Sequence, residues 1–292
     1  MAAVRVRSLA FRTDLMALRL AGGELEDGGD HLVARAPGNP HFYWGNFVLL
    51  AGTAPVEDAS RWLQTFARAF PGAQHVAIGW DRGSERGASR LQPLIRAGLE
   101  LTVDRVLLAE RLSSPRRPPA ATEVRRLAGE DDWAQLQELT AACWSGDGSP
   151  EFQAARQADF RRMEATGRAV FFGAYRGGKL VSGCGIVSGR GRTARFQHVQ
   201  THPEHRGQAL ASAVLIAASH HAETQFLARR LVIVADPGGP AIRLYRELGF
   251  RPAGSQLQLT AAPGDNPATP GVVLAGDCRR SRLGSDWGLP PS

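Results

Sequence analysis

Residues 206–212 (RGQALAS) combine an arginine with small side chains in a way that suits phosphate binding. They follow a predicted strand that ends at Thr201 and a turn at Pro203, and they open a predicted helix. Backbone N–H groups at a helix N-terminus have no intrahelical partner, and the helix dipole adds partial positive charge there. Small side chains let an anion approach this backbone, and Arg206 can add a charge-assisted contact. The segment therefore predicts a pyrophosphate-binding turn.

A second segment, residues 241–250 (AIRLYRELGF), places Tyr245 on a short predicted helix. Tyr245 lies 39 positions after Arg206, which leaves room for one helix and one strand between the two segments. Together the segments resemble the signatures of the GNAT family of N-acetyltransferases. Residues 206–211 are similar to the family's Q/R-x-x-G-x-G/A turn, with Ala209 in place of the usual glycine, and residues 241–250 resemble its A-x-x-L-Y-x-x-x-G-F element. Alanine at position 209 suits the turn if that residue is helical.

The resemblance covers Glu123 to about Thr260, and it implies a fold, an acyl donor and site residues. The fold class is α/β with a mixed sheet, and the acyl donor is acetyl-CoA. In the family, two parallel strands splay apart and the thioester lies between them, bound along one strand edge. The strand edge at 199–201 would then hold the pantetheine arm, and the turn at 206–212 the pyrophosphate. The cofactor-binding candidates are Val199, Gln200, Thr201, Arg206, Gly207, Gln208, Ala209, Leu210, Ala211 and Ser212.

The resemblance assigns Tyr245 the role of protonating the departing thiolate, and a phenol suits that role. Packing of a helix on the sheet is the structural alternative for this residue. The general base is not identified. His198 titrates in a useful range, but alternation places it on the face opposite Val199, which favours a histidine of the core or surface. Asp236 is the other candidate for base or amine anchor, and its alternative is turn formation.

The surrounding elements are predicted from periodicity and turn residues. In the second half the predicted strands are 122–127, 169–175, 179–188, 194–201, 230–235 and 255–260, and the predicted helices are 131–144, 151–165, 209–226 and 240–248. In the first half the predicted strands are 41–50, 75–81 and 99–110, and the predicted helices are 59–70 and 91–97.

The two halves of the chain match at nearly constant offsets, which predicts an internal repeat. Positions 47 and 199 are 152 apart, positions 81 and 236 are 155 apart, and positions 98 and 249 are 151 apart. The fold prediction is therefore two tandem GNAT-like acyl-CoA N-acyltransferase domains. The counterpart of the phosphate turn, residues 51–58 (AGTAPVED), lacks an arginine and carries two acids. We therefore expect the first copy to be degenerate and the chain to hold one cofactor site.

Composition and length suit a folded protein of two domains. The 292 residues are 43% hydrophobic and 22% charged, and residues 113–121 (SSPRRPPAA) have the composition of a linker. The predicted division is a degenerate GNAT-like domain at 1–112, the linker at 113–121, an acetyltransferase domain at 122–263, and a weakly ordered tail at 264–292. The three cysteines lie too far apart in the sequence for a zinc site, so no metal is expected.

These features predict a cytoplasmic N-acetyltransferase whose partners are acetyl-CoA and a primary amine on a small molecule or peptide. No secretory signal pattern and no run of about 20 apolar residues occurs, so no membrane association is expected. The formal charge of +7 comes from scattered arginines, so nucleic acid is not an expected partner. The alternative is a non-catalytic acyl-CoA sensor or interaction module.

Overall fold

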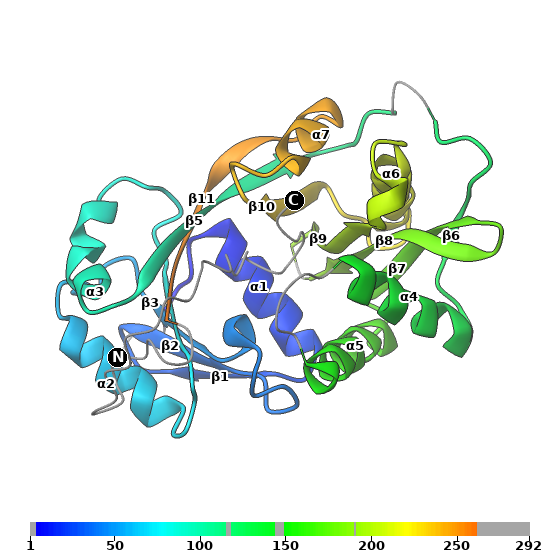
Figure 1. The fold of residues 1–292 in the computed structure, drawn as a ribbon. Helices are drawn as coiled ribbons and strands as arrows, with labels where there is room; N and C mark the ends of the chain where they lie inside the picture. The colour runs from blue at the N-terminus through cyan, green and yellow to red at the C-terminus, as the bar shows by residue number, and fades with distance from the viewer. Residues whose placement is uncertain (1–3, 115–117, 144–148, 190, 262–292) are drawn as a thin grey trace. The chain divides into compact units, whose positions relative to one another are not determined.

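The computed structural model describes residues 4–114, 118–143, 149–189 and 191–261, which form two compact units. The first unit contains residues 4–104 and 254–261, and the second contains the described residues between 105 and 253. Figure 1 shows the helices and strands of both. No helix within the described ranges has the length and apolar character that crossing a bilayer requires.

The second unit is a six-stranded sheet with helices on both faces (Figure 1). Its strand order is β5-β10-β9-β8-β7-β6, and only the β9–β10 pairing is parallel. Its strands are β5 (Glu100–Ala109, whose residues from 105 belong here), β6 (Glu123–Arg126), β7 (Ala169–Arg176), β8 (Lys179–Ser188), β9 (Thr193–Thr201) and β10 (Arg230–Ala235). Its helices are α4 (Gly129–Cys143), α5 (Pro150–Ala165), α6 (Leu210–Thr224) and α7 (Ala241–Glu247).

Alternating side chains on these strands separate the two helical layers. Phe172 on β7 packs in the apolar cluster formed with α6 and α7. Its neighbour Phe171 points to the other face, where its ring contacts Trp133 of α4 and Phe160 of α5 at centroid distances of 5.1 and 5.0 Å. The sheet is therefore buried on both sides, as its nearly continuous apolar strands require.

The first unit repeats this arrangement with five strands in the order β1-β2-β3-β4-β11. Only the β3–β4 pairing is parallel. Its strands are β1 (Glu24–Asp27), β2 (His31–Arg35), β3 (Phe47–Leu50), β4 (Val76–Trp80) and the greater part of β11 (Arg251–Ala261). Its helices are α1 (Leu9–Leu20), α2 (Ala59–Ala69) and α3 (Gln92–Arg96), with short 3₁₀ turns at Tyr43–Gly45 and Ala88–Leu91.

The strand orders confirm the predicted repeat, because β1-β2-β3-β4-β11 matches β7-β8-β9-β10-β5 position for position. The last strand of each copy lies in the other copy's sheet. Residues 105–109 of β5 pair with β10, and residues 257–261 of β11 pair with β4. Each unit therefore contains strands from both halves of the sequence. The sequence instead predicts a boundary between two domains at residues 113–121.

Most predicted elements match observed ones, and the differences lie mainly in the first unit. The predicted strand at 41–50 is wrong for 41–46, where a 3₁₀ turn forms and Asn46 uses its side-chain amide to bind the carbonyls of Asn39 and Phe42. The helix α1 and the strands β1 and β2 were not predicted from the sequence. The predicted tail at 264–292 lies outside the described residues, as do residues 144–148.

Candidate active site

The parallel strands β9 and β10 separate toward their carboxyl ends. Their pairing runs from Thr193–Arg230 to Arg195–Val232 and then stops, although β9 continues to Thr201. On its other side β9 stays paired with β8, as far as Thr201 opposite Ser182. The β9 edge from residue 196 onward therefore faces β10 without pairing to it, which is the splayed geometry that the resemblance to the GNAT family implies.

The turn between β9 and α6 presents free backbone donors. Within the described chain, no hydrogen bond is formed by the backbone N–H groups of residues 207–212, and no side chain caps α6. Gly207 and Ala209 both have positive φ angles, of 72° and 59°. Ala209 is therefore left-handed and precedes the helix, so the condition that it be helical is not met. The free donors and small side chains nevertheless fit a pyrophosphate.

Polar contacts fix the ends of this turn. Arg206 is exposed, and its Nε donates to the carbonyl of Thr201 at 3.3 Å. The Cys143 thiol, at the end of α4, donates to the same carbonyl at 3.3 Å, and burial raises its pKa. Gln208 accepts a hydrogen bond from Arg176 of β7. The turn thus has two arginines beside its free amides, which adds positive charge where a phosphate would bind.

Tyr245 lies on α7 with no exposed surface, in the apolar cluster between the helices and the sheet. Its ring contacts Phe250 at a centroid distance of 5.9 Å. Within the described chain its hydroxyl has no hydrogen-bond partner, and burial raises its pKa. The phenol is therefore protonated, and a buried hydroxyl without a partner is a group that a ligand can satisfy.

A β-bulge on β9 shapes the opposite face of the sheet. The register with β8 shifts between Gly183 and Gly185, and His198 takes a left-handed φ of 52°. Val199 therefore joins the α6 cluster, whereas His198 points to the other face. There His198 Nε2 lies 2.9 Å from the hydroxyl of Thr140 on α4. The two residues lie on opposite faces, as alternation predicts.

Thr140 joins His198 and Gln200 into one network that the sequence analysis did not identify. Its hydroxyl donates to the carbonyl of Leu136 at 2.8 Å and accepts from Gln200 Nε2 at 2.9 Å. It is therefore an acceptor for His198 as well, which places the imidazole proton on Nε2 and leaves Nδ1 as an acceptor. Burial, with the nearby charge of Arg156, lowers the pKa of His198 to about 3. His198 is neutral at physiological pH.

Asp236, the other candidate base, is exposed and lies just beyond β10. Its Oδ1 accepts a hydrogen bond from the Gly238 N–H at 2.8 Å, and its carbonyl accepts one from Gly239 at 3.1 Å. These contacts match the turn-forming alternative. No described contact joins Asp236 to His198 or Tyr245, so its catalytic role stays a prediction.

The first unit lacks both features of the site. Its parallel pair β3–β4 is bonded as far as Leu50–Trp80, and the Asp81 N–H then donates to the Leu50 carbonyl at 2.9 Å. At the start of α2, the Asp58 carboxylate accepts from the Arg61 N–H at 3.1 Å. A closed strand pair and an acidic cap therefore stand where the second unit has an open edge and free amides.

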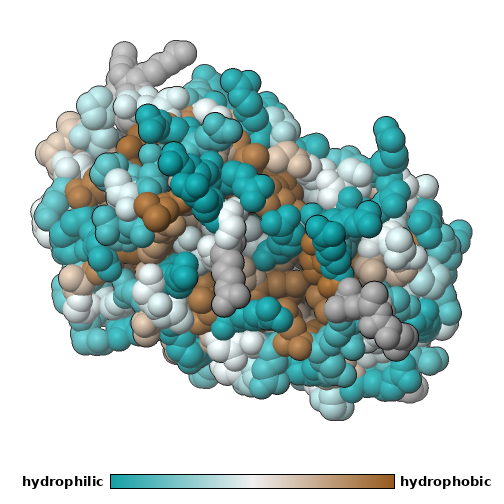
Figure 2. Space-filling model, turned by 180° about the vertical axis from the view of Figure 1, so that it is seen from behind, coloured by the Kyte–Doolittle hydropathy of each residue, from teal (hydrophilic) through white to brown (hydrophobic). Residues whose placement is uncertain are grey.

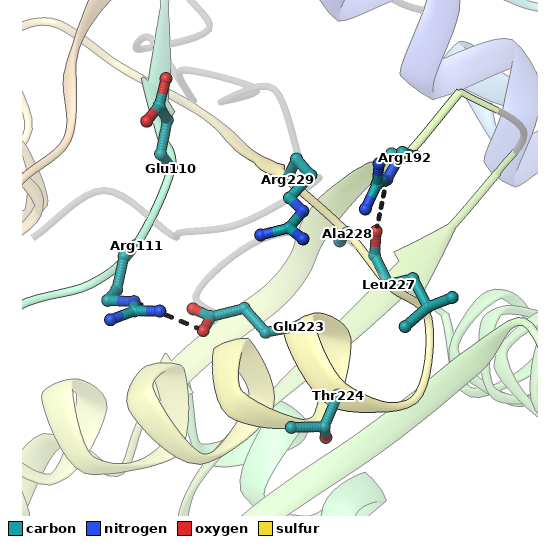
Figure 3. Close-up of a pocket in the computed structure, with 8 residues that line it drawn as sticks. All are labelled: Glu110, Arg111, Arg192, Glu223, Thr224, Leu227, Ala228 and Arg229. Carbon is teal, nitrogen blue, oxygen red and sulfur yellow. Dashed lines mark hydrogen bonds and ion pairs between the residues drawn. The ribbon is translucent and has the colours of Figure 1, made fainter.

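A separate pocket of about 240 Å³ lies at the other end of β9 (Figure 3). In it Arg111 pairs with Glu223 at 3.6 Å, and Arg192 Nε donates to the Leu227 carbonyl at 3.2 Å. Leu227 is 62% exposed, and among the described residues it is the large apolar side chain left in solvent. Figure 2 shows one face of the molecule, on which teal hydrophilic residues predominate and brown hydrophobic residues lie between them. None of the predicted site residues lines this pocket.

Comparison with known proteins agrees with this fold. The model of the acetyltransferase (GNAT) family matches residues 133–250, whereas no curated protein matches the sequence. A functionally unknown conserved protein from Staphylococcus epidermidis ATCC 12228 is similar in structure, with a TM-score of 0.65, 12% identity, and 82% of this chain and 94% of that one covered. A GCN5-related N-acetyltransferase from Kribbella flavida gives a TM-score of 0.63 at 17% identity, covering 87% and 95%.

A tandem GNAT protein from the clavulanic acid biosynthesis pathway is also similar, with a TM-score of 0.54 at 16% identity, covering 93% of this chain and 98% of that one. At these identities the likeness shows the fold, and the family match covers both predicted motifs. Residues 133–250 therefore form a domain that matches the acetyltransferase (GNAT) family, and the chain as a whole has two tandem copies of that fold.

Proposed function

We propose that the second copy is an N-acetyltransferase that uses acetyl-CoA and acetylates a primary amine of a small molecule or peptide. The observation that carries this proposal is the unpaired edge of β9, which continues into six free amides at the start of α6. A ligand that is extended at one end and anionic at the other would satisfy both. The pantetheine arm and pyrophosphate of an acyl-CoA have this form.

In this proposal the amine attacks directly while both substrates are bound. Acetyl-CoA supplies the acyl group as an activated thioester. The amine nitrogen forms a bond to the acyl carbon, the carbon–sulfur bond breaks, and Tyr245 donates its phenolic proton to the departing sulfur. Residues 199–201 hold the thioester arm by their backbone, and residues 206–212 hold the pyrophosphate.

The amine must lose a proton before it attacks, and two residues are candidates to receive it. His198 offers Nδ1 as an acceptor, but its pKa of about 3 means that it would not hold the proton at neutral pH. We therefore propose that His198 orients the amine or a water, and that the proton leaves to solvent. Asp236 is the second candidate acceptor, because it lies where β10 ends beside the unpaired β9 edge.

Replacement of Ala211 by glutamate tests the binding site. A carboxylate in the first turn of α6 would repel a pyrophosphate, so Ala211→Glu should abolish acetyl-CoA binding measured by calorimetry. Ala217→Glu, farther along the same helix, is the matched control. Unchanged binding by Ala211→Glu would place the cofactor elsewhere. Tight binding without thiol release on a panel of amines would instead indicate a non-catalytic acyl-CoA sensor.

A further inference from the structure

Gln197 lies on the face of the sheet that α4 and α5 cover. It stands directly opposite Gly185 on β8, and residues opposite each other on neighbouring strands point to the same face. A Cβ at Gly185 would lie 2.5 Å from the ring of Phe171, whose ring contacts Trp133 and Phe160. The side chain of Gln197 therefore points away from α6 and α7.

Three polar side chains of β9 share this face at the unpaired edge of the strand. His198 and Gln200 are fixed by their bonds to Thr140. Gln197 is only 1% exposed, yet within the described chain neither its Oε1 nor its Nε2 has a hydrogen-bond partner. A buried amide without partners is costly, so this group needs a ligand or an ordered water.

We propose that the Gln197 amide binds the acceptor, and that the acceptor carries a carboxamide or peptide group next to its amine. This inference rests on the proposed acetyltransferase function. Phe196 and Val199 pack with α6 on the other face, so the acceptor reaches the thioester from the face of Gln197. A glutamine amide offers one donor group and one acceptor group, which a second amide matches at two points. A carboxylate or an ammonium matches only one of them.

A pair of probe amines that differ in one group tests the proposal. L-Alaninamide and isopropylamine share the amine and the methyl group, but isopropylamine has a methyl in place of the carboxamide. With kcat/KM calculated on the unprotonated form of each amine, because the alkylamine is the more basic of the two, the wild-type enzyme should prefer alaninamide by roughly tenfold or more. In Gln197→Leu this preference should fall to about one, through a higher KM for alaninamide, while the KM for acetyl-CoA stays the same.

Gln225→Leu, at the exposed end of α6, is the matched control and should keep the wild-type preference. If Gln197 only holds a structural water, Gln197→Leu will change stability and leave the preference unchanged, which would overturn the proposal. The same ratio is measured without turnover by NMR titration of both probes into the protein saturated with CoA. Equal binding of the two probes by the wild type would also overturn it. Loss of CoA binding itself would instead count against the proposed function.

Discussion

Ala209 holds a backbone conformation that a residue with a Cβ adopts only at a cost. Its φ of 59° lies in the left-handed region, where an alanine loses roughly 1–2 kcal/mol relative to the right-handed region. Glycine carries no such cost. We expect Ala209→Gly to raise the free energy of unfolding by about 0.5–1 kcal/mol and to retain acetyl-CoA binding, as measured by urea unfolding and calorimetry.

Ala211, two residues later, is the control for this prediction because it lies inside α6. Glycine in a right-handed helix is unfavourable, so Ala211→Gly should lower stability by about 0.5–1 kcal/mol. The two substitutions are chemically identical, and opposite signs would establish the left-handed turn. If both variants lose stability, residue 209 is helical instead.

The buried phenol of Tyr245 allows stability and turnover to be tested with one substitution. Tyr245→Phe removes a hydroxyl that has no partner in the described chain, so stability should be unchanged or higher. Turnover should fall by roughly 10- to 1000-fold because the departing sulfur loses its proton donor. Single-turnover kinetics and calorimetry would separate this loss from any change in acetyl-CoA affinity. Undiminished turnover would leave Tyr245 as a packing residue.

The strand β10 and the helix α6 show what local sequence can predict. The apolar run at Arg230–Ala235 gives the strand at its observed bounds, and small residues after a turn give the start of the helix to within one residue. Tyr245 and Arg206 could be chosen as candidates because they belong to motifs of fixed spacing. In these places the local pattern and the tertiary structure agree.

Other features depend on contacts between distant segments, which one sequence does not display. The bulge at His198 interrupts the alternation of β9 without a glycine or proline to mark it. Thr140 bonds His198 and Gln200 only because α4 packs on β9, and His198 is 58 residues away from it in the sequence. The exchange of β5 and β11 between the sheets is invisible for the same reason, since each strand has an ordinary apolar pattern.

The two copies of the β-α unit differ most at the end where a cofactor would bind. In the second unit, β9 and β10 are unpaired beyond Arg195, and α6 begins without a cap. In the first unit, β3 and β4 pair to their ends, and Asp58 caps α2. We therefore expect one acetyl-CoA per chain, measured as the stoichiometry in calorimetry. A second bound equivalent that survives Ala211→Glu would show that the first unit also binds.

The first unit, which lacks the open strand edge and the free amides, still has a packed apolar core of its own. Its apolar cluster includes residues from β3, β4, α2 and the exchanged strand β11. Because β11 completes its sheet and residues 105–109 complete the other, neither half of the sequence holds all the strands of one unit. The first unit therefore depends on β11 from the second half of the sequence, and the second unit depends on residues 105–109 from the first half. The stability of each unit is for this reason a property of the whole chain.

The pH dependence of stability should report on a buried histidine in the first unit. His75 is only 3% exposed, stacks on Tyr43 at a centroid distance of 4.1 Å, and hydrogen-bonds the Asn46 carbonyl through Nε2. Burial lowers the pKa of His75 to about 4, whereas an unfolded histidine has a pKa near 6.5. Between these values the unfolded state binds more protons, so stability is greatest above pH 6.5 and falls as the pH falls toward 4.

For this one group the loss between pH 7.5 and pH 5 should be up to about 2 kcal/mol. His75→Gln removes the titration, so the variant should lose less stability over the same range by that amount, as measured by urea unfolding at both pH values. His220→Gln, at an exposed position on α6, should keep the wild-type dependence. An equal pH dependence in His75→Gln and the wild type would mean that His75 is protonated in the folded state, and therefore that its packing against Tyr43 accommodates a charge.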